Sequence, residues 1–183
     1  MDIFAHALWA GAGVMLAQRR WSISTRTAAA TVGLAVLPDV PHLLPIAGWS
    51  AFGSGTAAAV KGYAIAVPGQ GPVLPAAVEW LSHNLHCIPH SAIVAGAVTL
   101  LVWWWRQALW IPLLGWWSHI VIDVFTHSAD YYPSPVLWPL TREGFDGAAW
   151  NTTPFMTVNY IALTVAYLWL LPRWWRTRQG RID

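Results

Sequence analysis

The stretch QALWIPLLGWWSHIVIDVFTH, residues 107–127, decides the fold, because apolar side chains fill most of its positions and no Lys or Arg interrupts it. A helix needs about 20 predominantly apolar residues to cross a bilayer, and this stretch has that length and character. Further apolar stretches of the same kind lie at residues 3–18, 27–44, 91–105 and 154–172. The sequence therefore predicts an all-α fold, an integral membrane helical bundle of about five transmembrane helices.

The composition supports a membrane protein and restricts the chemistry that the chain can carry. Of the 183 residues, 56% are hydrophobic and only 10% are Asp, Glu, Lys or Arg, whereas a soluble domain has about 25% charged residues. The net charge of +2 leaves no broad basic surface, so nucleic-acid binding is excluded. The single cysteine, Cys87, can form neither an internal disulfide nor a thiolate metal site. Any metal site must therefore depend on His and carboxylate side chains.

The second span and the segment that follows it depart from regular helix. Three prolines lie near the outer end of this span: Pro38, Pro41 and Pro45. They are expected to end the regular helix near Leu37 and to leave the outer end unwound inside the protein. Residues 45–82 are rich in Gly, Ala and Pro, which predicts an irregular extracytoplasmic cap with a short helix from Ala76 to Leu81.

The distribution of basic residues predicts an orientation, because Lys and Arg near span ends are retained on the cytoplasmic side. Most basic residues fall on one side of the predicted bundle: Arg19, Arg20, Arg26, Arg106, Arg173, Arg176, Arg178 and Arg181. The N-terminus is then outside, and residues 173–183 form a cytoplasmic tail of Arg and Trp in a bacterial inner membrane. No Lys or Arg precedes the first apolar stretch, so it is interpreted as a retained helix of one membrane-embedded domain, residues 1–183.

With this orientation, every histidine lies in the outer half of the bundle. These residues are His6, His42, His83, His86, His90, His119 and His127. Asp39 and Asp123 lie in the same half. The predicted orientation depends only on apolar stretches and basic loops, so the positions of His and Asp are independent of it. Their clustering in one half of the bundle therefore indicates a site near the outer surface.

The spacing of these residues indicates a metal site. His119, Asp123 and His127 are four residues apart, so they project from one face of a helix about 6 Å apart along its axis. His86 and His90 have the same spacing, and the proline between them is expected in the first turn of the third span. Two helices can thus bring imidazole and carboxylate groups together, which is a ligand set that zinc or manganese takes.

Asp123 is the strongest single indication of a metal. A carboxylate inside a membrane span costs about 2.5 to 3.5 kcal/mol and is normally paired or faces water. No Lys or Arg lies in the same span, so a metal ion is favoured over a purely structural Asp–His hydrogen bond. His83 and His127 are interpreted as interfacial residues at helix ends. For His42 and His86 the sequence leaves open whether they bind metal or support the residues that do.

One segment of the chain resembles a known family. Residues 115–126, GWWSHIVIDVFT, followed by Trp138 and Pro139, resemble the G-x-x-S-H-x-x-L-D-x-x-T and later W-P signature of the membrane-bound, YdjM-type metal-dependent hydrolases. Shorter landmarks of that family occur in the same order: His6 with Gly11, Pro38 with Asp39, and the stretch from His86 to Ser91. Pro41 and Cys87 stand where the family has a second acid and an Arg. The motif spacing is similar to that of zinc-dependent phospholipases C, so the resemblance implies phosphoester hydrolysis.

The candidate ligands give a specific hypothesis for the site. The proposed metal ligands are His6, His86, His90, His119 and Asp123, with Asp39 as a further ligand or the general base. They would hold one or two divalent ions, zinc or manganese, and His42 would join a second site. Such an ion lowers the pKa of a bound water toward about 7, so water would be the nucleophile.

Three functions remain open from the sequence. The first is a membrane-embedded metal-dependent hydrolase that cleaves an ester or phosphoester, with a membrane lipid as the leading substrate. The second is an accessory or scaffold subunit of a larger membrane complex that keeps a silent or structural metal site. The third and weakest is proton or ion conduction along the His and Asp stripe, which lacks a polar continuation toward the inner face.

Overall fold

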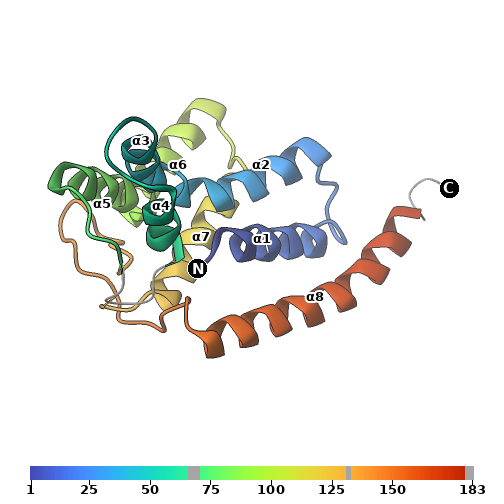
Figure 1. Cartoon of the computed structure of the whole chain (residues 1–183). Helices are drawn as coiled ribbons and strands as arrows, with labels where there is room; N and C mark the ends of the chain where they lie inside the picture. The colour runs from blue at the N-terminus through green and yellow to red at the C-terminus, as the bar shows by residue number, and fades with distance from the viewer. Residues whose placement is uncertain (66–70, 131–132, 180–183) are drawn as a thin grey trace.

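The computed structural model describes residues 1–65, 71–130 and 133–179, which form helices with no β-strand among them (Figure 1). The α-helices are α1 (Ile3–Ala17), α2 (Thr25–Val36), α3 (Leu44–Phe52), α4 (Ala57–Ile65), α5 (Ala76–His90), α6 (Ala92–Arg106), α7 (Leu113–Thr126) and α8 (Thr153–Gln179). Two short 3-10 helices, η1 (Leu37–Asp39) and η2 (Pro41–Leu43), join α2 to α3. The predicted all-α class is confirmed.

Fewer helices than predicted have the length and composition to cross a membrane. In the described residues, Thr25–Phe52 and Thr153–Trp175 qualify, and α5 with α6 would make a third span bent by 53°. The apolar helices α1 and α7 have 15 and 14 residues, which at 1.5 Å per residue makes each about 21 to 23 Å long. The hydrocarbon core is about 30 Å thick. The count is therefore two or three rather than five, because apolar character alone did not reveal how short these helices are.

The Gly- and Pro-rich segment is more regular than predicted. Helix α2 ends at Val36, next to the predicted end at Leu37, but the chain continues through η1 and η2 into α3. The predicted irregular cap over residues 45–82 contains most of α3, all of α4 and the first part of α5, while residues 66–70 lie outside the described ranges. Pro41 and Pro45 occupy first-turn positions of η2 and α3, where a missing N–H costs no hydrogen bond. The prolines therefore begin helices here instead of breaking them.

The break between α5 and α6 falls at Ser91. Its Oγ accepts hydrogen bonds from the backbone N–H groups of Ile93 and Val94, each at 3.1 Å, which caps α6. Pro89 consequently lies in the last turn of α5. The prediction that it lies in the first turn of the next span is therefore wrong. The predicted helix at Ala76 exists as the start of α5. The break leaves His90 as the last residue of α5, facing the centre of the bundle.

The helices α1, α2 and α7 pack together at the centre, and α8 lies along α1 (Figure 1). Hydrogen bonds fix α8 in place: the Tyr167 hydroxyl donates to the Leu8 carbonyl at 2.8 Å, and Trp9 Nε1 donates to Asn159 Oδ1 at 3.0 Å. Several of the largest fully buried side chains are polar, namely His6, His90, His119 and Asp123. The buried centre of this apolar protein is therefore a cluster of ionisable groups.

Candidate metal centre

Four buried side chains form the centre of the site. Asp39 comes from η1, His90 from the end of α5, and His119 and Asp123 from α7. Each offers a ligand atom, and these atoms all lie within 4.8 Å of one another. The group could hold a metal ion, which confirms the coarser part of the sequence prediction.

Local sequence explains how these residues reach one point. His119 and Asp123 are one helical turn apart, so they share a face of α7. Asp39 faces inward from the 3-10 turn that follows α2. His90 is held by the break after α5, where Trp116 Nε1 of α7 donates to the carbonyl of Pro89 at 2.6 Å.

The two central imidazoles have defined tautomers. Nδ1 of His90 lies 2.7 Å from the carbonyl oxygen of His86, and Nδ1 of His119 lies 2.8 Å from that of Ala35. A carbonyl oxygen only accepts hydrogen bonds, so in each ring Nδ1 carries the proton. In the neutral form, both Nε2 atoms then present lone pairs. This is the arrangement that orients histidine as a metal ligand.

These lone pairs point at one another and at two carboxylates. The Nε2 atoms of His90 and His119 are 3.0 Å apart, and Asp123 Oδ2 lies 3.2 and 3.1 Å from them. Asp39 Oδ1 lies 3.5 and 3.6 Å from the same two nitrogens. Despite these short contacts, Asp123 Oδ2 has no hydrogen-bond partner with acceptable geometry.

The donor set fits a divalent cation. A proton on one imidazole would satisfy one or two of the contacts, whereas an ion at the centre would satisfy all four groups and balance both negative charges. Imidazole nitrogen and carboxylate oxygen suit zinc, and manganese also takes such ligands.

His6 lies beside this group rather than within it. Its Nε2 is 2.9 Å from Asp123 Oδ1, the oxygen that faces away from His90 and His119. Its ring stacks on that of His119, with the centroids 3.8 Å apart and the planes at 25°. His6 is thus placed to orient two of the four central residues, and its predicted role as a metal ligand remains a prediction.

The other predicted residues surround a neighbouring cavity. The His86 ring stacks on the His90 ring, with the ring centroids 3.9 Å apart. The ring centroids of His42 and His127 lie 5.5 and 6.0 Å from that of His86. His127 is only 5% exposed, so its interpretation as an interfacial residue is wrong. His83 is half-buried and lies outside the four-residue group.

Some contacts at the site had no signal in the sequence. The amino group of Met1 contacts Asp123 Oδ1, and it lies 3.2 Å from His127 Nε2. The Tyr63 hydroxyl on α4 lies 3.2 Å from His42 Nδ1. Tyr63 is the one aromatic residue of an Ala-rich helix, so no spacing pattern could relate it to His42.

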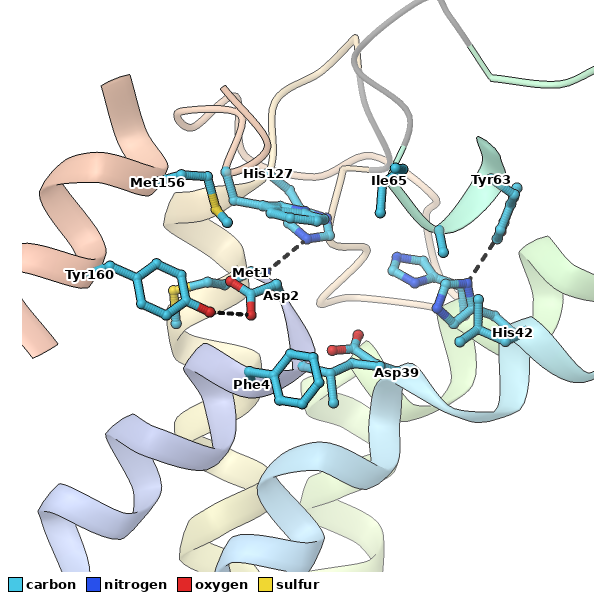
Figure 2. Close-up of a pocket in the computed structure, with 15 residues that line it drawn as sticks. Met1, Asp2, Phe4, Asp39, His42, Tyr63, Ile65, His127, Met156 and Tyr160 are labelled. Carbon is cyan, nitrogen blue, oxygen red and sulfur yellow. Dashed lines mark hydrogen bonds between the residues drawn. The ribbon is translucent and has the colours of Figure 1, made fainter. Parts of the chain in front are cut away.

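A cavity of about 340 Å³ opens beside the metal group (Figure 2). Asp39 and His42 line it from the η1 and η2 side, while Met156 and Tyr160 line it from α8. Apolar residues such as Phe4 make up most of the remaining wall, and its described lining contains no Lys or Arg. Its volume suits a ligand of the size that enzymes commonly bind.

Comparison of the chain with protein-family models, with curated proteins and with solved structures finds no match. The resemblance to the YdjM-type hydrolases therefore stays a prediction.

Removal of metal is expected to destabilise the protein. When the free metal concentration is a hundred times the dissociation constant, binding adds about 2.7 kcal/mol to the free energy of unfolding. Removal of the ion by EDTA should therefore lower Tm by roughly 5 to 10 °C. The measurement is thermal unfolding of zinc-loaded protein in detergent, followed by Tm recovery when zinc is restored. A Tm that chelation leaves unchanged in a demonstrably metal-loaded sample would show that the ion does not bind at the buried centre.

Proposed function

We propose that the protein is a membrane-embedded, divalent-metal-dependent hydrolase that cleaves an ester or phosphoester bond of a lipid at the outer face of the membrane. The observation that carries this proposal is the convergence of two imidazole nitrogens and two carboxylates next to an apolar cavity. A hydrolase needs such a ligand set together with space for a substrate and water.

The chain's own residues supply the remaining chemistry. When bound, the ion would polarise the carbonyl or phosphoryl oxygen of the substrate and lower the pKa of water. Asp39 lines the cavity, so its carboxylate is placed to accept a proton from the attacking water. The water oxygen bonds to carbon or phosphorus, the bond to the leaving oxygen breaks, and Asp39 returns the proton to that leaving group.

The cavity wall supports a lipid substrate. Apolar side chains, among them Phe4, Ile65 and Met156, form the part of the wall away from the histidines. Phe4 and Ile65 are also exposed on the outside of the protein. A lipid can therefore place its ester near Asp39 while its hydrocarbon chain stays against apolar surface.

The same geometry supports a placement in the membrane. The metal group lies where α1 and α8 begin, while Arg19 follows the end of α1 and Arg173 lies near the end of α8. We therefore place the site toward the non-cytoplasmic face and these arginines toward the cytoplasm of a bacterial inner membrane. The two or three long helical segments would cross the bilayer, with the shorter helices α1 and α7 packed against them.

The test is hydrolysis of defined lipids by zinc-loaded protein in mixed vesicles, with released head-groups and fatty acids identified by mass spectrometry. The wild-type protein should release one class of product, and His119→Ala should lower the rate by about 100-fold or more, since it removes a central ligand. His83→Ala, a change outside the metal group, serves as the control and should keep the wild-type rate. Zinc-loaded protein that cleaves no lipid ester would contradict the proposal and favour an accessory subunit with a structural ion.

A further inference from the structure

At the opposite end of α1 from the metal centre, the chain turns toward α2 (Figure 1). A second hollow lies near this turn. It is a groove of about 620 Å³, and its walls come from the last turns of α1 and the residues after it. The lining residues are Gly13, Leu16, Ala17, Arg19, Arg20 and Trp21. The proposed hydrolase activity makes no use of this groove.

One half of the groove is apolar and open. Gly13 and Ala17 are four residues apart, so they leave a strip without large side chains along one face of α1. A Cβ added at Gly13 would meet nothing within 4 Å. Leu16, which is 50% exposed, borders the strip. This half has the shape and polarity to hold a hydrocarbon chain.

The other half of the groove is cationic. Arg19 and Arg20 are both exposed, and the Arg19 guanidinium lies 5.3 Å from the Trp169 ring of α8. Arg173 lies over the same ring at 4.5 Å, so a further cation stands close by. Cation–π stacking holds Arg19 in place and leaves its N–H donors for another partner.

No described acidic side chain forms an ion pair with Arg19 or Arg20. The ion pairs among the described side chains, in residues 1–65, 71–130 and 133–175, all involve Asp39 or Asp123, at the other end of the molecule. Guanidinium groups bind phosphate with paired, charge-assisted hydrogen bonds. Trp21, which is 63% exposed, is of the residue type that favours the membrane interface.

We propose that this groove is a binding site for an anionic phospholipid. The phosphate lies on Arg19 and Arg20, and one acyl chain follows the strip from Ala17 to Gly13 toward the middle of the bilayer. The hydrogen bond from Trp174 Nε1 to Gln18 Oε1, at 2.6 Å, joins α8 to the rim of the groove. Bound lipid would therefore hold the ends of α1 and α8 together.

The experiment measures retained lipid by native mass spectrometry of the full chain in detergent. Phosphatidylglycerol and the zwitterionic phosphatidylcholine are the two probes. Arginine near a membrane surface contributes about a fivefold effect on anionic lipid binding, so Arg19→Gln with Arg20→Gln should weaken phosphatidylglycerol binding roughly 30-fold. Arg20→Gln alone leaves the Trp169 stack intact and should weaken binding about fivefold.

Matched controls distinguish specific lipid binding in the groove from nonspecific attraction of anionic lipid to any positive charge. Arg106→Gln removes a similar arginine at the end of α6, outside the groove, and should leave binding unchanged. Gly13→Leu fills the apolar half without changing charge and should lower binding, whereas Gly96→Leu, at another open position, should not. Tm values confirm that each variant is folded.

Two outcomes would overturn the proposal. Equal losses in Arg106→Gln and in the double variant would show a general effect of charge. Equal retention of phosphatidylcholine and phosphatidylglycerol would show that the groove does not select an anionic head-group. The metal-site variant Asp123→Asn should bind phosphatidylglycerol normally, so the result does not depend on the hydrolase.

Discussion

Asp123→Asn is expected to abolish metal binding and to reduce hydrolysis to background. The carboxylate is fully buried, and its two oxygens have different partners. Oδ1 lies within hydrogen-bond distance of His6 Nε2, at 2.9 Å. Oδ2 lies 3.2 Å from Nε2 of His90 and 3.1 Å from Nε2 of His119. Asparagine keeps the shape of the side chain but removes its negative charge, and an NH2 donor replaces one of the two carboxylate oxygens.

The measurement is the metal content of purified protein after gel filtration, with the residual affinity determined by zinc titration. We expect the occupancy to fall from about one ion to less than about a tenth, which corresponds to a loss in affinity of at least about 100-fold. Asp130→Asn removes an exposed carboxylate and should keep full occupancy. Full occupancy in Asp123→Asn would mean that the ion binds elsewhere and that the central group is only structural.

The sequence predicted the parts of the site that depend on local geometry. His119 and Asp123 share a face because they are one turn apart, and the cost of burying Asp123 in an apolar span required a partner. Asp39 and His90 were candidates because both lie in the predicted outer half of the bundle, with His90 four residues after His86 and Asp39 in a landmark of the resembling family. The structure brings these four residues together.

The contacts that distinguish their roles were beyond prediction. The proton on His119 Nδ1 is fixed by the carbonyl of Ala35, which is 84 residues away in the sequence. That carbonyl is a backbone group, so no residue type marks it. His6 was predicted as an equal ligand, yet it contacts the outer oxygen of Asp123 because of how α1 packs on α7. Helix packing, which sets these distances, leaves only weak traces in one sequence.

For the fold, as for the site, the sequence predicted local features but not those that depend on helix length and packing. Apolar stretches correctly predicted helices, since burial or lipid contact requires satisfied backbone groups in either case. They did not distinguish helices that cross a membrane from shorter ones such as α1 and α7. Residues 45–82 were predicted as irregular because Gly and Pro disfavour helix interiors. Pro41 and Pro45, however, lie in the first turns of η2 and α3, where proline is tolerated, so their position mattered more than the composition.

Gly115→Ala is expected to disrupt both the fold and the metal site. Gly115 lies on α7 one turn before His119, where the backbone of α2 packs directly against α7. A Cβ at this position would lie 1.9 Å from the carbonyl oxygen of Thr31 and 3.2 Å from the backbone nitrogen of Ala35. Backbone atoms cannot move aside as a side chain can, so the two helices must separate by about 1 Å. That separation would lengthen the hydrogen bond from His119 Nδ1 to Ala35, which measures 2.8 Å.

The expected cost is about 3 kcal/mol of folding free energy, at the upper end for overpacked sites, and a Tm lower by roughly 6 to 12 °C. Zinc affinity should fall by about tenfold or more, because His119 loses the contact that orients it. Gly33→Ala on α2 is the matched control, since a Cβ there meets nothing within 4 Å. It should leave zinc affinity unchanged and keep or raise Tm, because alanine favours helix over glycine. If Gly115→Ala matched this control in both measurements, the close packing of α2 on α7 would not be what positions His119.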